Sequence, residues 1–206
     1  MYQASPRQRL LKWMYPLLLR LSRLAGRHAT VLENTEHTPP AVPVYRLSVT
    51  LNDGSLYSLE RARGRKLLLV NTASYCGYTD QYRQLQQLYS RCGEHLQILG
   101  FPSNNFQEQE KGSDQDIARF CRMNYGIGFP LVRKSTVVKG EGQHPVYQWL
   151  SHADRNGWND KAPSWNFSKY LIDEEGVLTH YFDPAITPDS PEFLQALGLK
   201  QGAAAE

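Results

Sequence analysis

Cysteine is scarce in this sequence. The 206 residues contain three cysteines, Cys76, Cys92 and Cys121. An odd and low count argues against a fold held together by disulfides, and it is compatible with a reducing compartment such as the cytoplasm, while leaving export open. The three cysteines and six histidines also lack metal-ligand spacing, so neither a metal nor another cofactor is expected.

Long hydrophobic runs are also missing. The longest uncharged apolar run near the N-terminus, Trp13 to Leu19, is far shorter than the roughly 20 residues that a membrane-spanning helix needs. Lys12 and Arg20 bound this run, and Pro16 interrupts it. No small-residue cleavage site clearly follows, so the segment is a poor signal peptide. The sequence therefore predicts no transmembrane helix.

Acidic residues are absent from the first 32 residues, which hold six basic ones. The remainder has 17 Lys and Arg against 20 Asp and Glu, and a slightly acidic body argues against nucleic-acid binding. In residues 7–27 the leucines fall on one side of a helix and the basic residues on the other. This pattern predicts a basic amphipathic extension, residues 1–32, that contacts an anionic membrane surface and makes the protein peripheral to a membrane. A helix packed on the body and a poorly ordered tail are the alternatives.

The rest of the chain has the composition of one globular domain, since 41% of all residues are hydrophobic. Residues 33–42 predict a linker, 43–199 the domain and 200–206 a tail. The periodicity and turn residues predict strands at 45–51, 56–59, 66–71, 95–101, 167–172 and 177–182, and helices at 79–92, 113–123, 144–151 and 191–197. A strand–helix–strand unit followed later by an antiparallel pair and a helix is the order of a thioredoxin-like α/β fold, with a central mixed sheet flanked by helices.

Cys76 lies where the predicted strand 66–71 gives way to the helix 79–92, in the stretch NTASYCGYTDQY. The free N–H groups and the positive dipole end of a helix N-terminus stabilise a thiolate and lower its pKa. A thiolate is the form of cysteine that peroxides oxidise to a sulfenic acid. Thr79 stands where a second cysteine would complete a C-x-x-C motif, so a dithiol oxidoreductase is excluded. The alternative for Cys76 is a small buried hydrophobic residue.

Four blocks of sequence together resemble the signature blocks of the glutathione peroxidases. They are NTASYCGYTDQY (71–82), ILGFPSNNFQEQEKG (98–112), FCRMNYGIGFPLV (120–132) and SWNFSKYLIDEEG (164–176). The blocks occur in the order and at about the spacing of that family, and the resemblance covers roughly residues 43–199. It implies a thiol-dependent peroxidase that acts on hydrogen peroxide and on organic or lipid hydroperoxides.

The resemblance also implies which residues carry the reaction. Cys76 matches the peroxidatic position, and Gln109, Trp165 and Asn166 match the other members of the catalytic tetrad. Amide and indole N–H groups are neutral donors, which can hold a thiolate and stabilise the departing oxygen. Taken singly, Gln109 is also compatible with a solvated loop residue and Trp165 with a core aromatic residue.

Cys121, 45 residues after Cys76, resembles the resolving cysteine of thioredoxin-dependent members of the family. A disulfide needs Cα atoms within roughly 7 Å, so we expect the helix that carries Cys121 to unwind locally. The alternatives are a buried helix cysteine and recycling by glutathione. Cys92 is near a helix C-terminus, where the dipole disfavours a thiolate, and we expect it to be inert.

Several positions depart from the family pattern. Asn105 stands where glutamine is usual, Gln107 where glycine is common, Lys111 where proline is common and Ser103 where cysteine is frequent. The segment between Leu150 and Trp165 lacks the insertion that tetrameric members use for assembly. This predicts a monomer or weak dimer with an open site. A peroxide sensor that relays its disulfide, and a binding module on an inactive fold, are the other function classes.

Overall fold

The computed structural model describes residues 29–199. The predicted amphipathic segment 7–27 and the predicted tail 200–206 therefore lie outside the described residues. In chain order the elements are β1 Val31–Glu33, η1 Val44–Arg46, β2 Ser48–Thr50, β3 Leu56–Ser58, η2 Leu59–Ala62, β4 Lys66–Thr72, α2 Gln81–Cys92, β5 Leu96–Pro102, α3 Asp114–Tyr125, α4 Pro145–Leu150, α5 Ala153–Asn156, β6 Lys169–Ile172, β7 Leu178–Phe182 and α6 Pro191–Ala196. Within residues 29–199, no helix is both long and apolar enough to cross a bilayer.

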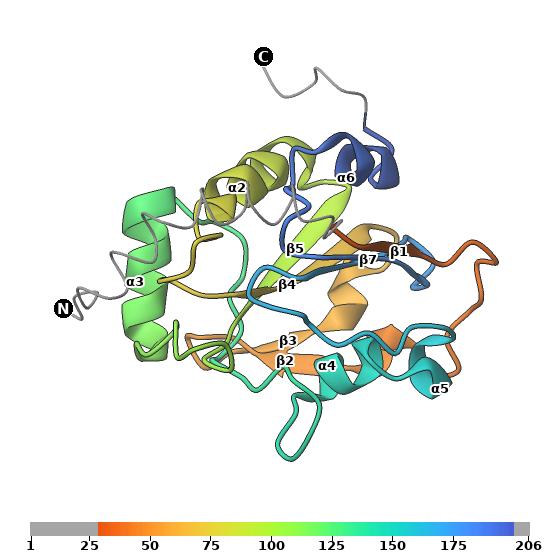
Figure 1. Ribbon diagram of the computed structural model, residues 1–206, viewed down its shortest axis with the longest axis horizontal. Coiled ribbons are helices and arrows are strands. Elements are labelled where there is room, and N and C mark those ends of the chain that lie inside the picture. The colour runs from red at the N-terminus through yellow and green to blue at the C-terminus, as the bar shows by residue number, and fades with distance from the viewer. Residues whose placement is uncertain (1–28, 200–206) are drawn as a thin grey trace.

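The main sheet has five strands in the order β1-β7-β6-β4-β5, shown in Figure 1. β4 runs parallel to β5, and the other neighbours pair antiparallel, so the predicted mixed sheet is confirmed. β4 and β5 are buried along nearly their whole length. Their apolar runs form strands because both faces of the sheet centre are covered.

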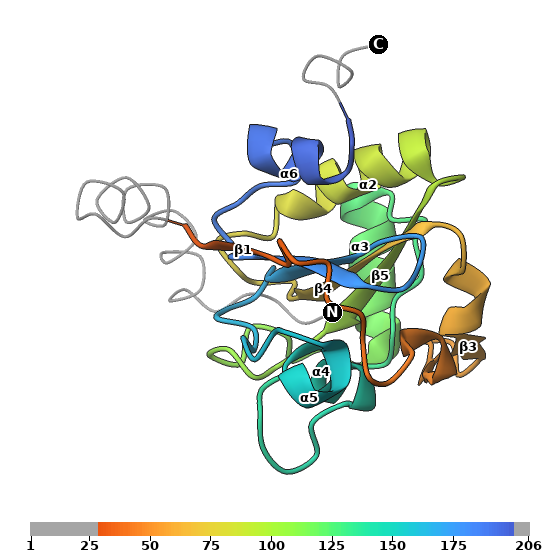
Figure 2. The ribbon, with the colours of Figure 1, turned by 90° about the vertical axis from the view of Figure 1, so that its right-hand side faces the viewer.

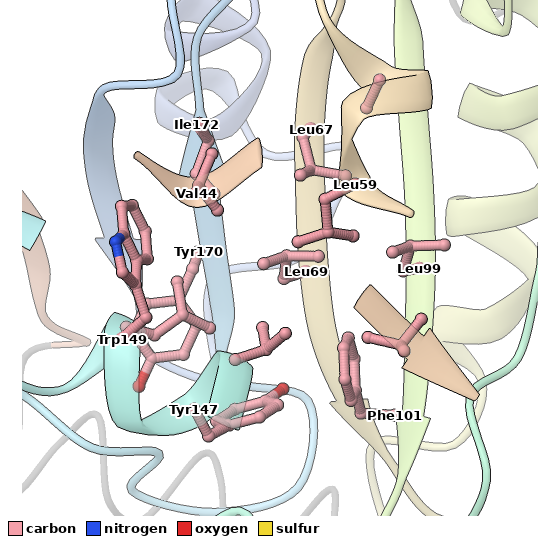
Figure 3. Packing of buried hydrophobic residues seen from close by; sticks show 14 of the residues in the cluster. Val44, Leu59, Leu67, Leu69, Leu99, Phe101, Tyr147, Trp149, Tyr170 and Ile172 are labelled. Atoms are coloured by element: carbon pink, nitrogen blue, oxygen red, sulfur yellow. The ribbon is translucent and has the colours of Figure 1, made fainter. Parts of the chain in front are cut away.

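Helices cover the sheet on both faces, as Figure 2 shows with α2 and α6 on one side and α4 and α5 on the other. The face toward α2, α3 and α6 holds the cluster that contains both Cys76 and Cys121. The opposite face packs against η1 and α4, with Tyr147 and Trp149 among the largest fully buried side chains (Figure 3). The two clusters hold the sheet between them. The candidate site lies at the carboxyl edge of this sheet, where β4 leads into α2.

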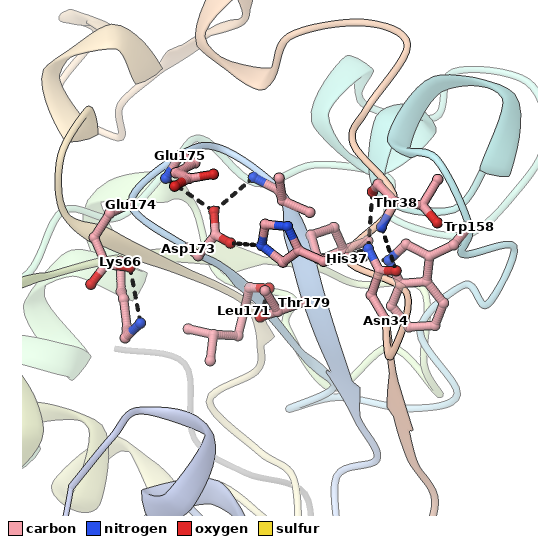
Figure 4. A network of polar contacts seen from close by, with 12 residues as sticks. Asn34, His37, Thr38, Lys66, Trp158, Leu171, Asp173, Glu174, Glu175 and Thr179 are labelled. Carbon is pink, nitrogen blue, oxygen red and sulfur yellow. Dashed lines mark hydrogen bonds and ion pairs between the residues drawn. The ribbon is translucent and has the colours of Figure 1, made fainter.

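The strand β1 was not predicted. It pairs antiparallel with β7, with Leu32 opposite Tyr181, and it crosses the expected boundary between the extension and the linker. The following residues are also attached to the body: Asn34 Nδ2 donates to the carbonyl of Leu178, and His37 Nε2 lies 2.7 Å from Asp173 Oδ2 (Figure 4). The segment predicted as a linker, 33–42, is thus bonded to the body, and its first residue, Glu33, belongs to β1.

The helix α3 confirms the predicted start at Ser113. The Ser113 side chain accepts from the backbone N–H of Asp116, and the Asp116 side chain accepts from the backbone N–H of Ser113, which makes a complete capping box. Gly126 ends the helix with a φ of 63°, where glycine is the least strained residue. The predicted strand 45–51 is shorter than expected, because its first residues form η1.

Candidate active site

The loop between β4 and α2 carries Cys76, and Thr79 holds it in shape. The Thr79 hydroxyl accepts from the backbone N–H of Cys76 at 2.9 Å and lies 3.0 Å from the carbonyl of Ala73. Thr79 is buried, so the bonds are shielded from water. Sequence reasoning noted Thr79 only for not being cysteine. Its hydroxyl, three residues after Cys76, is the signal that could have indicated this role.

Cys76 is fully buried, and burial raises the pKa of its thiol. Several groups act in the opposite direction: the backbone N–H of Tyr78, 3.4 Å from Sγ, then Asn166, Trp165 and the N–H of Gly77. α2 begins only at Gln81, so these donors come from the loop and from the 165–166 segment rather than from the first turn of the helix. The expected lowered pKa and open access are therefore wrong for the resting thiol.

The four predicted site residues are brought together. The Asn166 side-chain amide donates to Gln109 Oε1 at 2.9 Å, and the Gln109 carbonyl accepts from the N–H of Tyr75, next to Cys76, at 3.1 Å. Asn166 and Trp165 both lower the pKa of Cys76. Among the described residues, the buried Trp165 Nε1 has no acceptor, so its N–H is available to a sulfur anion. Gln109 and Asn166 are both buried, so the alternative of a solvated Gln109 is wrong.

The segment that carries Trp165 and Asn166 is held in a strained conformation. Phe167 has a φ of 69°, in the left-handed region that non-glycine residues rarely adopt. Its N–H donates to the Asn71 carbonyl, and the Asn71 side chain donates to the Trp165 carbonyl at 3.0 Å. The buried Lys169 donates to the carbonyls of Phe167 and Ile186. These bonds attach the segment to β4 and to the loop after β7, which fixes both tetrad side chains.

The 102–112 loop has an ordered shape despite its departures from the family pattern. The Asn105 Oδ1 accepts from the N–H of Val137 and from the Ser103 hydroxyl, both at 2.8 Å. Gln107 and Glu108 adopt φ values of 49° and 51°. A glycine would fit the position of Gln107 without strain, which explains why glycine is common there. The loop still delivers Gln109 to Asn166.

Cys121 lies on the buried face of α3 as a free thiol, and burial raises its pKa to about 12. Cys76 is also a free thiol. Cys92 is half-buried near the end of α2, far along the helix from the Cys76 loop. Within residues 29–199, no group of three or more His, Cys, Asp or Glu side chains could hold a metal ion.

A buried cysteine surrounded by amide and indole donors, at the carboxyl edge of a mixed sheet, defines a thiol-based oxidoreductase with a thioredoxin-like fold. The sequence profile "Glutathione peroxidase" matches residues 44–151. The glutathione peroxidase homolog BsaA of Staphylococcus epidermidis is 43% identical over 147 residues, which are 71% of this chain and 92% of that protein. A glutathione peroxidase-like peroxiredoxin of Saccharomyces cerevisiae is 37% identical over 147 residues, covering 71% and 90%.

Solved structures agree with this assignment. The crystal structure of T. cruzi GPX1 is similar with a TM-score of 0.56 at 31% identity, covering 76% of this chain and 97% of that chain. The chain belongs to the glutathione peroxidase family. It is a peroxidase, an oxidoreductase with a peroxide as acceptor.

Proposed function

We propose that this peroxidase reduces hydrogen peroxide and organic or lipid hydroperoxides with the Cys76 thiol, and that Cys121 and thioredoxin regenerate this thiol. The contact between Asn166 and Gln109 carries the proposal, because it joins Gln109 to a side chain that itself acts on the Cys76 thiol. The sulfur of Cys76 attacks the terminal peroxide oxygen and the O–O bond breaks. The thiol proton passes to the departing oxygen, which leaves as water or an alcohol, and Cys76 becomes a sulfenic acid.

The tetrad side chains act as neutral donors in this step. The indole of Trp165 and the amide of Asn166 stabilise the negative charge on sulfur, as their effect on the Cys76 pKa indicates. Gln109 accepts from Asn166 through its oxygen, which orients its own NH₂ group as a donor. We assign to Gln109 the role of binding the peroxide oxygen.

In the second step, the Cys121 thiol condenses with the sulfenic acid. An S–S bond forms, the sulfenic oxygen leaves as water, and thioredoxin then reduces the disulfide by exchange. Cys121 lies in an intact, capped helix, so we expect α3 to unwind locally before the bond forms. Both thiols belong to one buried cluster, which keeps the required movement inside that part of the domain.

Glutathione is the alternative reductant, because the family and its staphylococcal relative are named for it. Glutathione carries two carboxylates and would need cationic side chains near Cys76. The surface pocket next to Gly77 offers the cation of Arg83 and the opposing charge of Asp80. The name of the yeast relative, a peroxiredoxin, favours a disulfide mechanism.

The deciding experiment measures hydrogen peroxide consumption by the wild type and by Cys121→Ser. One cuvette contains thioredoxin and its reductase, and the other contains glutathione and its reductase. Fast turnover with thioredoxin that is lost in Cys121→Ser supports the proposal. Full turnover of Cys121→Ser with thioredoxin, or turnover with glutathione alone, refutes the role of Cys121. Loss of one equivalent of peroxide without cycling indicates a sensor.

We also propose a cytoplasmic monomer or weak dimer, peripheral to a membrane through residues 7–27, with a role in the response to oxidative stress. The basic, leucine-rich composition of residues 7–27 supports the membrane contact. Flotation with anionic liposomes tests it: equal binding with and without residues 1–28 refutes the contact. Analytical ultracentrifugation tests the oligomeric state.

A further inference from the structure

Glu110 is a carboxyl group that the proposed reaction leaves without a role. It follows Gln109 in the chain and is 1% exposed. Its Oε2 accepts from the Ser74 hydroxyl at 3.1 Å, and its backbone N–H donates to the Asn104 side chain at 2.9 Å. A carboxyl group is rarely buried to this extent without a paired cation. The bond from Ser74 attaches the Glu110 side chain to the loop that carries Cys76.

The opposite side of Glu110 meets α3. Ser74, Glu110, Ile117 and Phe120 line the same pocket of about 340 Å³. Ile117 is one helical turn before Cys121, so the two share the buried face of α3. The charge of Glu110 also contributes to the raised pKa of Cys121, after burial. Glu110 thus lies between the segments that carry the two reactive cysteines.

One oxygen of the Glu110 carboxyl group is unpaired. Among the described residues, Glu110 Oε1 is one of the buried side-chain oxygens that lack a hydrogen-bond partner. The neighbouring Tyr82 hydroxyl interacts with Cys121 and with Thr72, and both affect the pKa of Tyr82. A buried polar atom without a partner costs stability, and a catalytic role is one explanation for its retention. Glu110 Oε1 is therefore free to accept a proton.

We propose that Glu110 is the proton acceptor for Cys121 during disulfide formation. This inference rests on the proposed function, because it assumes that Cys121 resolves the sulfenic acid of Cys76. The Cys121 S–H bond breaks as its sulfur attacks the Cys76 sulfur, and Glu110 takes the proton. The S–O bond of the sulfenic acid breaks, and the departing hydroxide takes a proton from Glu110 and leaves as water. The carboxylate is regenerated and no net proton is consumed.

The proton affinities of the two groups suit this step. Burial raises the pKa of Glu110 to about 7, so the carboxylate is a stronger base than an exposed one and is still available at neutral pH. The pKa of Cys121 is about 12, so a free thiolate does not accumulate in the closed site. Cys121 therefore approaches Cys76 as a thiol when α3 unwinds. Glu110 stays bonded to the Cys76 loop through Ser74, so its carboxylate is positioned to accept the proton where the S–S bond forms. The other charged groups facing this region are Lys134, which acts on Glu110, and Asp116 and Arg119 at the pocket.

The test separates the two chemical steps. Reduced protein is mixed with one equivalent of hydrogen peroxide at pH 5.5 to 8.5 and quenched at intervals. A sulfenic-acid trap counts the first product, and labelling of the remaining thiols counts the disulfide. The variants are Glu110→Gln and, as a matched control, Glu108→Gln, which removes an exposed carboxylate of the same loop. Thermal melting verifies that both variants fold.

In the wild type, the rate of disulfide formation should rise with pH to a plateau above about 7, where Glu110 is deprotonated. Glu110→Gln should lose this rise and form the disulfide roughly 100-fold more slowly at pH 8. It should still accumulate the sulfenic acid. The control Glu108→Gln should behave as the wild type. An unchanged rate and pH profile in Glu110→Gln overturns the inference. If that variant does not fold, a wild-type profile without the rise overturns it. If the wild type forms no disulfide between Cys76 and Cys121, the proposed function fails instead.

Discussion

Replacing Glu110 with glutamine should make the protein more stable at alkaline pH. The folded-state pKa of Glu110 is about 7, against 4.5 for an unperturbed glutamate, because burial penalises the charged form. The native state therefore binds the proton more tightly than the unfolded state. The stabilising effect of this proton is fully present below pH 4.5 and is lost as the pH rises through 7. A difference of this size corresponds to a loss of about 3 kcal/mol in the free energy of unfolding.

Glu110→Gln removes this titration and keeps an oxygen that accepts from Ser74. We expect the unfolding free energy of the wild type to fall relative to that of the variant by about 3 kcal/mol between pH 4.5 and 8. Urea unfolding of both proteins, with all thiols kept reduced, measures this difference at each pH. Glu108→Gln serves as the control, because Lys111 lowers the pKa of Glu108 and so gives the opposite sign. Parallel curves for the wild type and Glu110→Gln would show that Glu110 titrates normally and would refute this reasoning.

Three further predictions concern the reactive thiols. Because burial raises the Cys76 pKa, the rate of sulfenic acid formation should increase from pH 6 to 9 in stopped-flow experiments; a flat profile would mean a low thiol pKa. Thr79→Val removes the acceptor for the Cys76 N–H and should lower the unfolding free energy by about 1–3 kcal/mol, whereas Thr79→Ser should retain stability and peroxidase rate in urea titrations and turnover assays. Ser113→Ala removes the cap of α3 and should cost about 1 kcal/mol, which raises the labelling rate of Cys121 by a thiol reagent roughly fivefold; equal labelling would argue against local opening of α3.

Much of the fold could be predicted because its local signals agree with its tertiary contacts. β4 and β5 are apolar runs that become buried central strands, and Ser113 starts α3 through a capping box that is visible in the sequence. β1 could not be predicted in this way. Three residues carry little periodicity, and the pairing partner β7 lies almost at the other end of the chain. β1 forms because the backbone N–H and C=O groups at the edge of β7 are available for pairing.

The members of the candidate site could be named from sequence, but their electrostatics could not. The resemblance to a family identifies Gln109 and Asn166, and the structure brings them into contact. The direction of the Cys76 pKa shift depends on how completely the surrounding elements exclude water, which local sequence does not encode. The burial of Glu110 could not be predicted either, because the sequence QEQEKG is typical of a solvated loop. Its burial results from Ser74, 36 residues earlier in the chain, and from the way α3 folds back over the loop.

The position of β1 has a practical consequence for any shortened form of this protein. β1 covers the outer edge of β7, and the segment 130–132 covers β5 at the other end of the sheet through bonds to Gly100. Removing Val31–Glu33 together with the basic segment would leave the N–H and C=O groups of β7 unpaired and open to strands of other molecules. A truncation that begins after Glu33 would then aggregate, and the loss of activity would be mistaken for a role of the N-terminal segment in catalysis. A truncation that retains Thr30 onward avoids this error.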